Sequence, residues 1–551
     1  MKAYKNIEIS ESIVSLEMID SDHFGVIDSA NIYRVYNIKT FDRVSGFKSN
    51  VEAATDYREK SVISPDGSCI AFYSESKKEI YLFDTHKKAF IHKIHPHQTG
   101  LESLRFSKDS TYLISGGMDG RVYLWCAKSG KKLDTLASHA DSVHVVALSD
   151  NGRWSATAGH DNIIRVSNRS FHGMHYRLIS HKSVPTTLTF ISAQRIVSTD
   201  RDGVVLIWDI QTSKVINRLE SFKSEIRTST LSKDGKYLIV CGIHGEVGLY
   251  NLEEAILLKR DFLKHTSGVN RVLYSLDHHS FIFGLDDGTI TIYNLQREEQ
   301  SLKELFQKHQ YSECYIMTKD NPLLRDALHF KKLEALFDVY YKKARQLLAK
   351  NQKVNAQNVL DYFSATKEKR LIIQKLFSDF SFYPQLKNAY AAQKLVMAYT
   401  MVEKYSELEY TSEYRGMEKR WVKTLKVVQS IEDDKNYDEK ISALFKPYKG
   451  IASKNGIVKA LHDDRNIFKI FLHAIEKKEY YTAFNVVENH QFLKGLPEYK
   501  RLLSIGDIYE ENIHNAFNSG EYHQAVKFCD IVSYFPGKKE FAGNIKGRAN
   551  I

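Results

Sequence analysis

The amino-acid sequence predicts a multidomain β + α protein: a seven-bladed β-propeller followed by an all-α solenoid of helical hairpins. Two observations lead to this fold class. A strand signature recurs every 41 to 43 residues in the first half, and an apolar spacing of three and four residues replaces it in the second half. Four-stranded propeller blades repeat at about 40 to 45 residues, and helices bury a stripe with the second spacing. We expect domains at 1–305 and 306–551.

Each copy of the strand signature is a short run of β-branched, aromatic and other apolar residues, often ending in an aromatic residue and an Asp or Asn. The six clear copies are 80–84, 122–126, 163–167, 205–209, 247–251 and 290–294, and a looser copy covers 32–37. Seven blades would therefore fill the first domain. Either residues 2–8 or residues 302–306 could supply the strand that closes the ring.

A tight turn between two strands recurs at 113–120, 201–203 and 286–288. This pattern resembles the WD-repeat family, in which a loop His, a strand Ser or Thr, a turn Asp and a Trp form a buried hydrogen-bond network. The resemblance implies two complete sets: His97, Ser115, Asp119 and Trp125 in blade three, and His181, Ser198, Asp202 and Trp208 in blade five. Partial sets are His139, Thr157 and Asp161 in blade four, with Val166 for the aromatic residue, and His265, Asp287 and Tyr293 in blade seven.

Ser, His and Asp are also the residue types of a catalytic triad. A satisfied polar network fixes a blade without leaving buried donors unpaired, whereas nucleophilic catalysis needs one exposed nucleophile beside its base. Because the set recurs around the ring, we interpret it as structural and predict no catalytic residue.

The sequence contains no phosphate-binding loop, no His-Glu-x-x-His and no Cys-x-x-Cys. His92, His95 and His97 have a spacing that zinc could use, but His97 already belongs to the blade network. We therefore predict no cofactor, no metal and no enzyme. An enzyme subunit with a metal or cofactor site in the propeller channel is an alternative hypothesis.

Propellers usually bind partners through the loops where the second-to-third strand turns converge around the channel. We expect the residue before each turn Asp, or its equivalent, to point there. These candidate partner-binding residues are Met118, His160, Arg201, Ile243 and Asp286. They would give this face a ring of mixed apolar and charged side chains.

The second half shows helical spacing. Segments 473–484 and 515–526 align at an offset of 42 residues, each with an Ala three residues after a Tyr. This alignment is similar to the tetratricopeptide hairpin, best near 466–536, and the domain order is similar to coatomer subunits in architecture only. Five prolines are expected at helix boundaries or first turns: Pro322, Pro384, Pro447, Pro497 and Pro536. The basic, Gly-containing residues after 536 suggest a tail or docking peptide.

The net charge of +11 is unevenly divided. Residues 1–300 carry 37 Lys and Arg against 36 Asp and Glu, and residues 301–551 carry 41 against 31. An acidic partner would therefore bind the second half, so a nucleic-acid-associated protein is a further alternative. Interspersed Lys and Glu that solvate helix surfaces are the simpler interpretation.

The five cysteines form no close pair, and neither a signal-peptide core nor an apolar run of about eighteen residues occurs. We expect a reducing, cytoplasmic compartment and no membrane insertion. Together these observations predict a non-enzymatic protein–protein interaction scaffold or adaptor. It would bridge other proteins through the propeller loops and the helical solenoid.

Overall fold

The computed structural model describes residues 3–55, 59–136, 138–169, 175–232, 234–275, 277–431, 436–463, 465–518 and 521–549. The chain divides into two compact units, Met1–Ala335 and Leu336–Ile551. Strand gives way to helix between Asn294 and Leu295, so the first unit contains the propeller, two whole helices and the start of a third.

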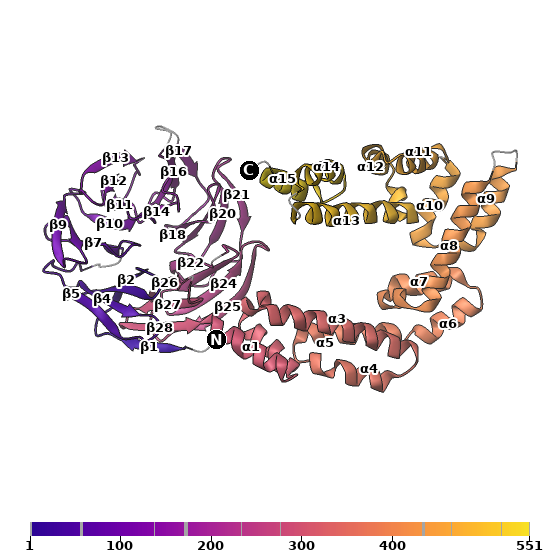
Figure 1. Ribbon diagram of the computed structural model, residues 1–551, viewed down its shortest axis with the longest axis horizontal. Helices are drawn as coiled ribbons and strands as arrows, with labels where there is room; N and C mark the ends of the chain where they lie inside the picture. The colour runs from indigo at the N-terminus through magenta and orange to yellow at the C-terminus, as the bar shows by residue number, and fades with distance from the viewer. Residues whose placement is uncertain are drawn as a thin grey trace. The chain divides into compact units, whose positions relative to one another are not determined.

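Seven four-stranded antiparallel sheets stand around a ring (Figure 1). The first strands of neighbouring blades contact one another in the order β2, β6, β10, β14, β18, β22 and β26, and β26 returns to β2. The predicted seven-bladed propeller is confirmed. Because each blade is covered on both faces by its neighbours, its strands are apolar on both faces, as in β23 and β27, where every residue is buried.

The blades take their strands in sequence order. Blade one contains β2 Ile13–Met18, β3 His23–Asp28, β4 Ile32–Asn37 and β5 Arg43–Lys48; blade two contains β6 Ser61–Ile63, β7 Cys69–Ser74, β8 Glu79–Asp84 and β9 Ala89–Ile94. Blade three contains β10 Leu101–Phe106, β11 Tyr112–Gly117, β12 Val122–Cys126 and β13 Lys132–Leu136; blade four contains β14 Val145–Leu148, β15 Trp154–Ala158, β16 Ile164–Asn168 and β17 His175–Leu178.

The last three blades differ only in how the ring closes. Blade five contains β18 Pro185–Phe190, β19 Arg195–Asp200, β20 Val205–Asp209 and β21 Lys214–Arg218; blade six contains β22 Ile226–Leu231, β23 Tyr237–Gly242, β24 Glu246–Asn251 and β25 Ile256–Lys264. Blade seven contains β26 Val269–Ser275, β27 Ser280–Leu285, β28 Thr289–Asn294 and, as its outer strand, β1 Lys5–Glu8.

Strand β1 closes the ring by pairing antiparallel with β28, from Lys5 opposite Ile292 to Glu8 opposite Thr289. Ile7 packs against the apolar cluster of blades seven and one, which includes Ile290. The N-terminal alternative for closure is therefore the correct one. Residues 302–306 lie instead in the first helix, α1.

The rest of the chain is helical. The helices are α1 Leu295–Gln307, α2 Tyr311–Asp320, α3 Leu328–Ala349, α4 Lys353–Leu360, α5 Lys367–Phe380, α6 Tyr383–Ala391, α7 Leu395–Lys404, α8 Ser412–Ser430, α9 Tyr437–Phe445, α10 Ala452–Asp463, α11 Arg465–Glu476, α12 Tyr480–Asn489, α13 Pro497–Asn518, α14 Tyr522–Val532 and α15 Lys539–Ala549. Short 3-10 turns lie at Pro322–Asp326, Asp361–Phe363, Ser406–Tyr410, Lys446–Tyr448 and Gln491–Gly495.

The helices of the second unit pack in sequential pairs, α11 on α12 and α13 on α14. Ala483 and Ala525, the matching alanines of the two aligned segments, are both fully buried, which allows close helix approach. Gly520 of the second segment lies outside the described residues. The first four of the five prolines stand in first turns and Pro536 lies between α14 and α15, as predicted.

The C-terminal segment differs from the expected tail. It forms helix α15, because Ala542 and Ile545 are spaced to face one side and pack with Cys529 and Val532 of α14. Lys546 of this helix pairs with Asp530 of α14 at 2.5 Å.

Candidate interaction surface of the propeller

The four residues predicted for blade three form one buried hydrogen-bond chain. His97 Nδ1 lies 3.0 Å from Asp119 Oδ1, and His97 Nε2 lies 3.1 Å from Ser115 Oγ. Trp125 Nε1 donates to the same Ser115 Oγ at 2.9 Å. Because a carboxylate accepts, Nδ1 of His97 donates to Asp119, and Nε2 is left to accept from the Ser115 hydroxyl. Burial lowers the pKa of His97 and favours this neutral ring.

Blade five forms the same chain with a different carboxylate. His181 Nε2 lies 2.6 Å from Ser198 Oγ, which accepts from Trp208 Nε1 at 2.7 Å. His181 Nδ1 bonds at 2.7 Å to Asp200 and not to the predicted Asp202, so that assignment is wrong.

The change of partner follows from the residue two positions after the strand hydroxyl. In blade three this residue is Gly117, and a Cβ there would meet His97 Nδ1 at 2.3 Å. The absent side chain leaves room for Asp119 to reach the ring. In blade five the same position carries Asp200, whose own carboxylate fills that space, so Asp202 is displaced to the exposed turn.

Blade four completes its chain without an aromatic residue. His139 bonds to Asp161 at 2.9 Å and to Thr157 at 2.8 Å. Burial would raise the pKa of Asp161, but hydrogen bonds from His139 and Arg165 outweigh burial and lower it to about 2. The strand register places Ser167, not the predicted Val166, at the position that Trp125 takes in blade three.

Blade seven lacks the hydroxyl. Phe283 stands where Ser115 stands in blade three, with its ring centroid 4.9 Å from that of His265. Nε2 of His265 is buried and has no hydrogen-bond partner. Burial lowers the pKa of His265 to about 4, against the attraction of Asp287.

The serine hydroxyls of these networks are closed to substrate. Ser115 and Ser198 are fully buried, and each Oγ is already shared by a His and a Trp. A nucleophile must reach a substrate carbon and exchange its proton with a base, and neither hydroxyl has that access. The geometry therefore supports the structural interpretation of both sets.

All five predicted partner-binding residues lie in second-to-third strand turns. Every blade has the same strand order, so these turns leave the sheets at one end of the propeller, which we call the turn face. Met118 is 42% exposed and lies over Gly100, while the ring of His160 stands perpendicular to that of His144 with centroids 5.8 Å apart.

The structure links the other predicted residues in blades five to seven. The Glu225 carboxylate approaches Arg201 Nε at 3.9 Å, and the Glu225 backbone carbonyl accepts the backbone N–H of Ile243 at 3.2 Å. Asp286 accepts from Arg227 at 2.6 Å and from Asn270 at 2.7 Å. Met118 and His160 lie apart from this group, in the turns of blades three and four.

Sequence reasoning missed Glu225, Arg227 and Asn270 because they lie on first strands or the loops before them, where the repeat fixes no residue type. It also missed a charged cluster at the centre of the ring. Glu59, just before β6, contacts Arg271 of blade seven at 2.6 Å and Arg105 of blade three at 3.5 Å. Charged residues inside otherwise apolar first strands are the signal that would have found this cluster.

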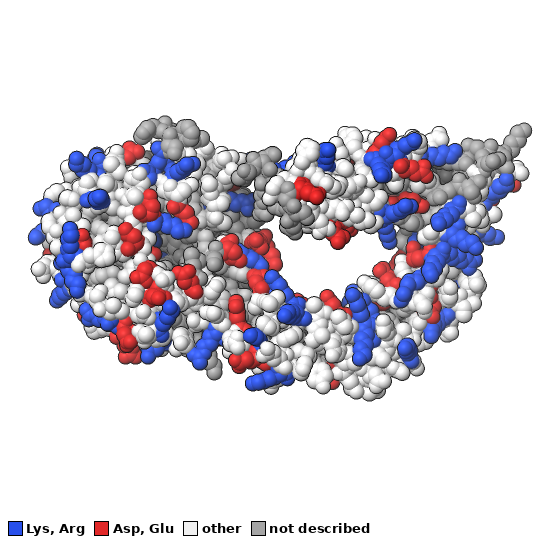
Figure 2. All heavy atoms as spheres, viewed as in Figure 1, with Lys and Arg blue, Asp and Glu red and all other residues white. Residues whose placement is uncertain are grey.

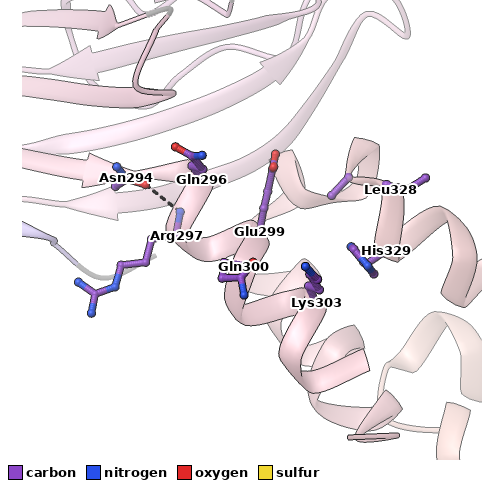
Figure 3. Close-up of a pocket in the computed structure, with 9 residues that line it drawn as sticks. Asn294, Gln296, Arg297, Glu299, Gln300, Lys303, Leu328 and His329 are labelled. Atoms are coloured by element: carbon purple, nitrogen blue, oxygen red, sulfur yellow. Dashed lines mark hydrogen bonds between the residues drawn. The ribbon is translucent and has the colours of Figure 1, made fainter. Parts of the chain in front are cut away.

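A hollow of about 590 Å³ lies on the propeller unit beside the start of α1 (Figure 3). Asn294 caps this helix by accepting the N–H of Arg297 at 2.7 Å. The lining carries charges of both signs, since it includes the acidic Glu299 and the basic Lys303.

Among the described residues, no group of three His, Cys, Asp or Glu side chains is placed to hold a metal ion. None of the described helices is both long and apolar enough to span a bilayer.

Residues 88–126 and 130–167 match the family model described as WD domain, G-beta repeat. Each match runs from the outer strand of one blade through the first three strands of the next, which is the same offset that β1 uses to close blade seven. The propeller therefore carries WD repeats, and the resemblance stated from the sequence is confirmed.

Three curated proteins illustrate the similarity. The maize protein named "Guanine nucleotide-binding protein subunit beta" is 22% identical over 247 residues, 42% of this chain and 65% of that protein. "Autophagy-related protein 16" of Arabidopsis thaliana is 20% identical over 241 residues, 43% of this chain and 47% of that protein. "Transcription factor unc-37" of Caenorhabditis elegans is 26% identical over 194 residues, which are 35% of this chain and 31% of that protein. The chain spans less than two thirds of each relative.

Proposed function

We propose that this chain is a non-enzymatic scaffold or adaptor that binds one protein at the turn face of the propeller and another through its helical unit. One observation carries the proposal. The side chains that look catalytic are buried and bonded to one another, whereas the turn residues, which the repeat does not dictate, differ from blade to blade and reach the surface. A closed ring also offers rigid loops without a free strand edge.

Two further observations support the proposal. The name of the maize relative calls that protein a subunit, which favours a role in an assembly for this chain as well. All five cysteines are unpaired, and four of them are buried, which fits a reducing compartment such as the cytoplasm. Neither observation identifies the partner.

The experiment compares two variants of the full chain in affinity purification with cross-linking from the native host. In the first variant, Met118→Glu and His160→Glu place negative charge on the turn face. In the control, Arg153→Glu and Gln194→Glu add at least as much negative charge to exposed first-to-second strand turns, at the other end of the propeller. We expect proteins that cross-link to the turn face to be lost only with the first variant.

The proposal would be abandoned if both variants recovered the same proteins in the same amounts as the unaltered chain. It would also be abandoned if cross-links to recovered proteins never included the turn face. Equal far-ultraviolet circular dichroism of the three chains shows that the comparison concerns binding and not folding.

A further inference from the structure

Helix α8 of the second unit carries one strongly basic face. Its members are all exposed: Arg415, Lys419, Lys423 and Lys426 follow one another at four, four and three residues, and Arg420 lies next to Lys419. The buried residues of the helix lie on the opposite side: Met417, Trp421, Leu425 and Val428. Figure 2 shows Lys and Arg side chains gathered over α8. We call these five residues the basic strip.

The residues that the structure describes do not neutralise the basic strip. Glu418, the one carboxylate between Arg415 and Lys426, turns aside and pairs with Lys454 Nζ at 2.8 Å. Within the described ranges, no carboxylate forms an ion pair with Lys419, Lys423 or Lys426. The two arginines use neutral acceptors, the carbonyl of Tyr410 for Arg415 and the side-chain amide of Gln393 for Arg420.

This arrangement is unfavourable for the isolated helix. Like charges four residues apart destabilise a helix, and Arg415, Lys419 and Lys423 form two such pairs in succession. Ordinary solvated helices alternate the two signs and avoid this repulsion. An anionic partner would convert the repulsion into attraction.

Apolar groups accompany the charges. Val427 is 42% exposed beside the strip, and Val422 is partly exposed on its other side. Tyr390 of α6 lies against the backbone of Gly416, where a Cβ would come within 2.5 Å of its hydroxyl oxygen, and remains 37% exposed. A partner with apolar side chains can cover these groups, but a phosphodiester backbone cannot.

We propose that the basic strip docks an acidic α-helix of a partner protein, which deepens the scaffold function and rests on it. Arg415, Lys419, Lys423 and Lys426 are spaced four, four and three residues apart, so they span about 17 Å at a rise of 1.5 Å per residue. A second helix with Glu at the same spacing presents its carboxylates at the same intervals. Each exposed ion pair contributes weakly, so several pairs must act together, and the flanking valines add apolar contact.

The test measures binding of the full chain to a fluorescent, alanine-based helical peptide with Glu at positions i, i+4, i+8 and i+11. The strip variant is Lys419→Glu, Lys423→Glu and Lys426→Glu. The matched control is Lys367→Glu, Arg370→Glu and Lys375→Glu, which makes the same charge change at exposed positions of α5. We expect the strip variant to bind at least tenfold more weakly and the control to stay within twofold, with binding that weakens as salt rises.

Three outcomes would overturn the proposal: no binding by the unaltered chain at low salt, equal loss in both triple variants, or preference for another anion. For the third, 20-nucleotide single-stranded and duplex DNA and RNA and phosphatidylserine vesicles serve as competing probes. If the unaltered chain bound a nucleic acid or the vesicles more tightly than the peptide, and the strip variant abolished that binding, the strip would be a phosphate-binding site. The scaffold function is judged separately by the turn-face variant, because the peptide assay does not involve the propeller loops.

Discussion

At the scale of single residues, Asp200 accepts three hydrogen bonds in the polar network of blade five. Its Oδ2 accepts from His181 at 2.7 Å, and its Oδ1 accepts the backbone N–H groups of Asp202 at 3.0 Å and Val204 at 2.9 Å. Asp200→Ala would leave three donors at a 1% exposed site without their acceptor. We expect it to lower the free energy of unfolding by about 3 to 5 kcal/mol.

The matched variant Asp202→Ala is expected to change stability by less than about 1 kcal/mol, because that side chain is exposed. Urea unfolding followed by tryptophan fluorescence compares the two, since Trp208 belongs to the same network. Equal losses, or a larger loss for Asp202→Ala, would contradict the corrected assignment.

His265 links stability to pH. Its pKa falls from 6.5 to about 4 on folding because burial disfavours the charged ring. A histidine with a lowered folded pKa gives full stability above pH 6.5 and loses it as pH falls toward 4. The unaltered chain should therefore lose about 2 kcal/mol between pH 7.5 and pH 5 through this residue.

His265→Phe, which can pack with Phe283 and Tyr293, is expected to remove that loss, whereas His86→Phe at an exposed position should retain it. Urea midpoints at the two pH values give the measurement. If His265→Phe kept the same acid sensitivity as the unaltered chain, another group would be responsible.

The sequence predicted which residues meet in the blade networks better than it predicted how they pair. The resemblance to WD repeats placed His97, Ser115, Asp119 and Trp125 in one network, and the structure joins all four. The resemblance failed at Asp202 because the choice between two nearby carboxylates depends on whether the position two residues before the turn Asp is Gly, as at 117, or Asp, as at 200. The side chain at that one position decides which carboxylate reaches the histidine, and a pattern shared by all blades does not specify that side chain.

At the scale of elements, ring closure depends on four residues of β1. Ile7 faces the apolar cluster between blades seven and one, whereas Asn6 is exposed. Ile7→Asp would bury a carboxylate without a partner, so we expect β1 to detach from β28 and the amide hydrogens of residues 289–292 to exchange faster. Asn6→Asp adds the same charge on the outer side and should leave exchange unchanged. Unaltered exchange in Ile7→Asp would show that the ring does not depend on β1.

The sequence left ring closure open for a physical reason. An outer strand with a single apolar residue has almost no alternation to detect, and residues 302–306 offered a similar short run. The helix α15 was missed for the opposite reason, since its Lys and Gly residues obscured the spacing of Ala542 and Ile545. Long helices and the proline-marked boundaries were predictable because each carries several independent signals.

At the scale of the whole propeller, the contacts that define the turn face and the channel join residues far apart in the chain. Arg227 and Asp286 are 59 residues apart in the sequence, and Glu59, just before blade two, pairs with Arg271 of blade seven although blade one lies between those two blades. No local pattern predicts such pairs, because they depend on the number of blades and on the direction of each first strand. The location of the candidate surface was therefore predictable, but its internal contacts were not.

Variants of Glu59 test whether the channel cluster of Glu59, Arg105 and Arg271 stabilises the ring. Its carboxylate pairs with Arg271, whose side chain is 11% exposed, and also approaches Arg105 of a different blade. Glu59→Gln would leave Arg271 without its charge partner in a largely buried place, and we expect a loss of about 3 kcal/mol in the free energy of unfolding. The double variant Glu59→Gln with Arg271→Met removes the stranded charge as well, so it should recover part of that loss. A double-mutant cycle in urea should therefore give a coupling energy above about 1 kcal/mol; additive single losses would mean that the two blades are held together by their neighbours alone.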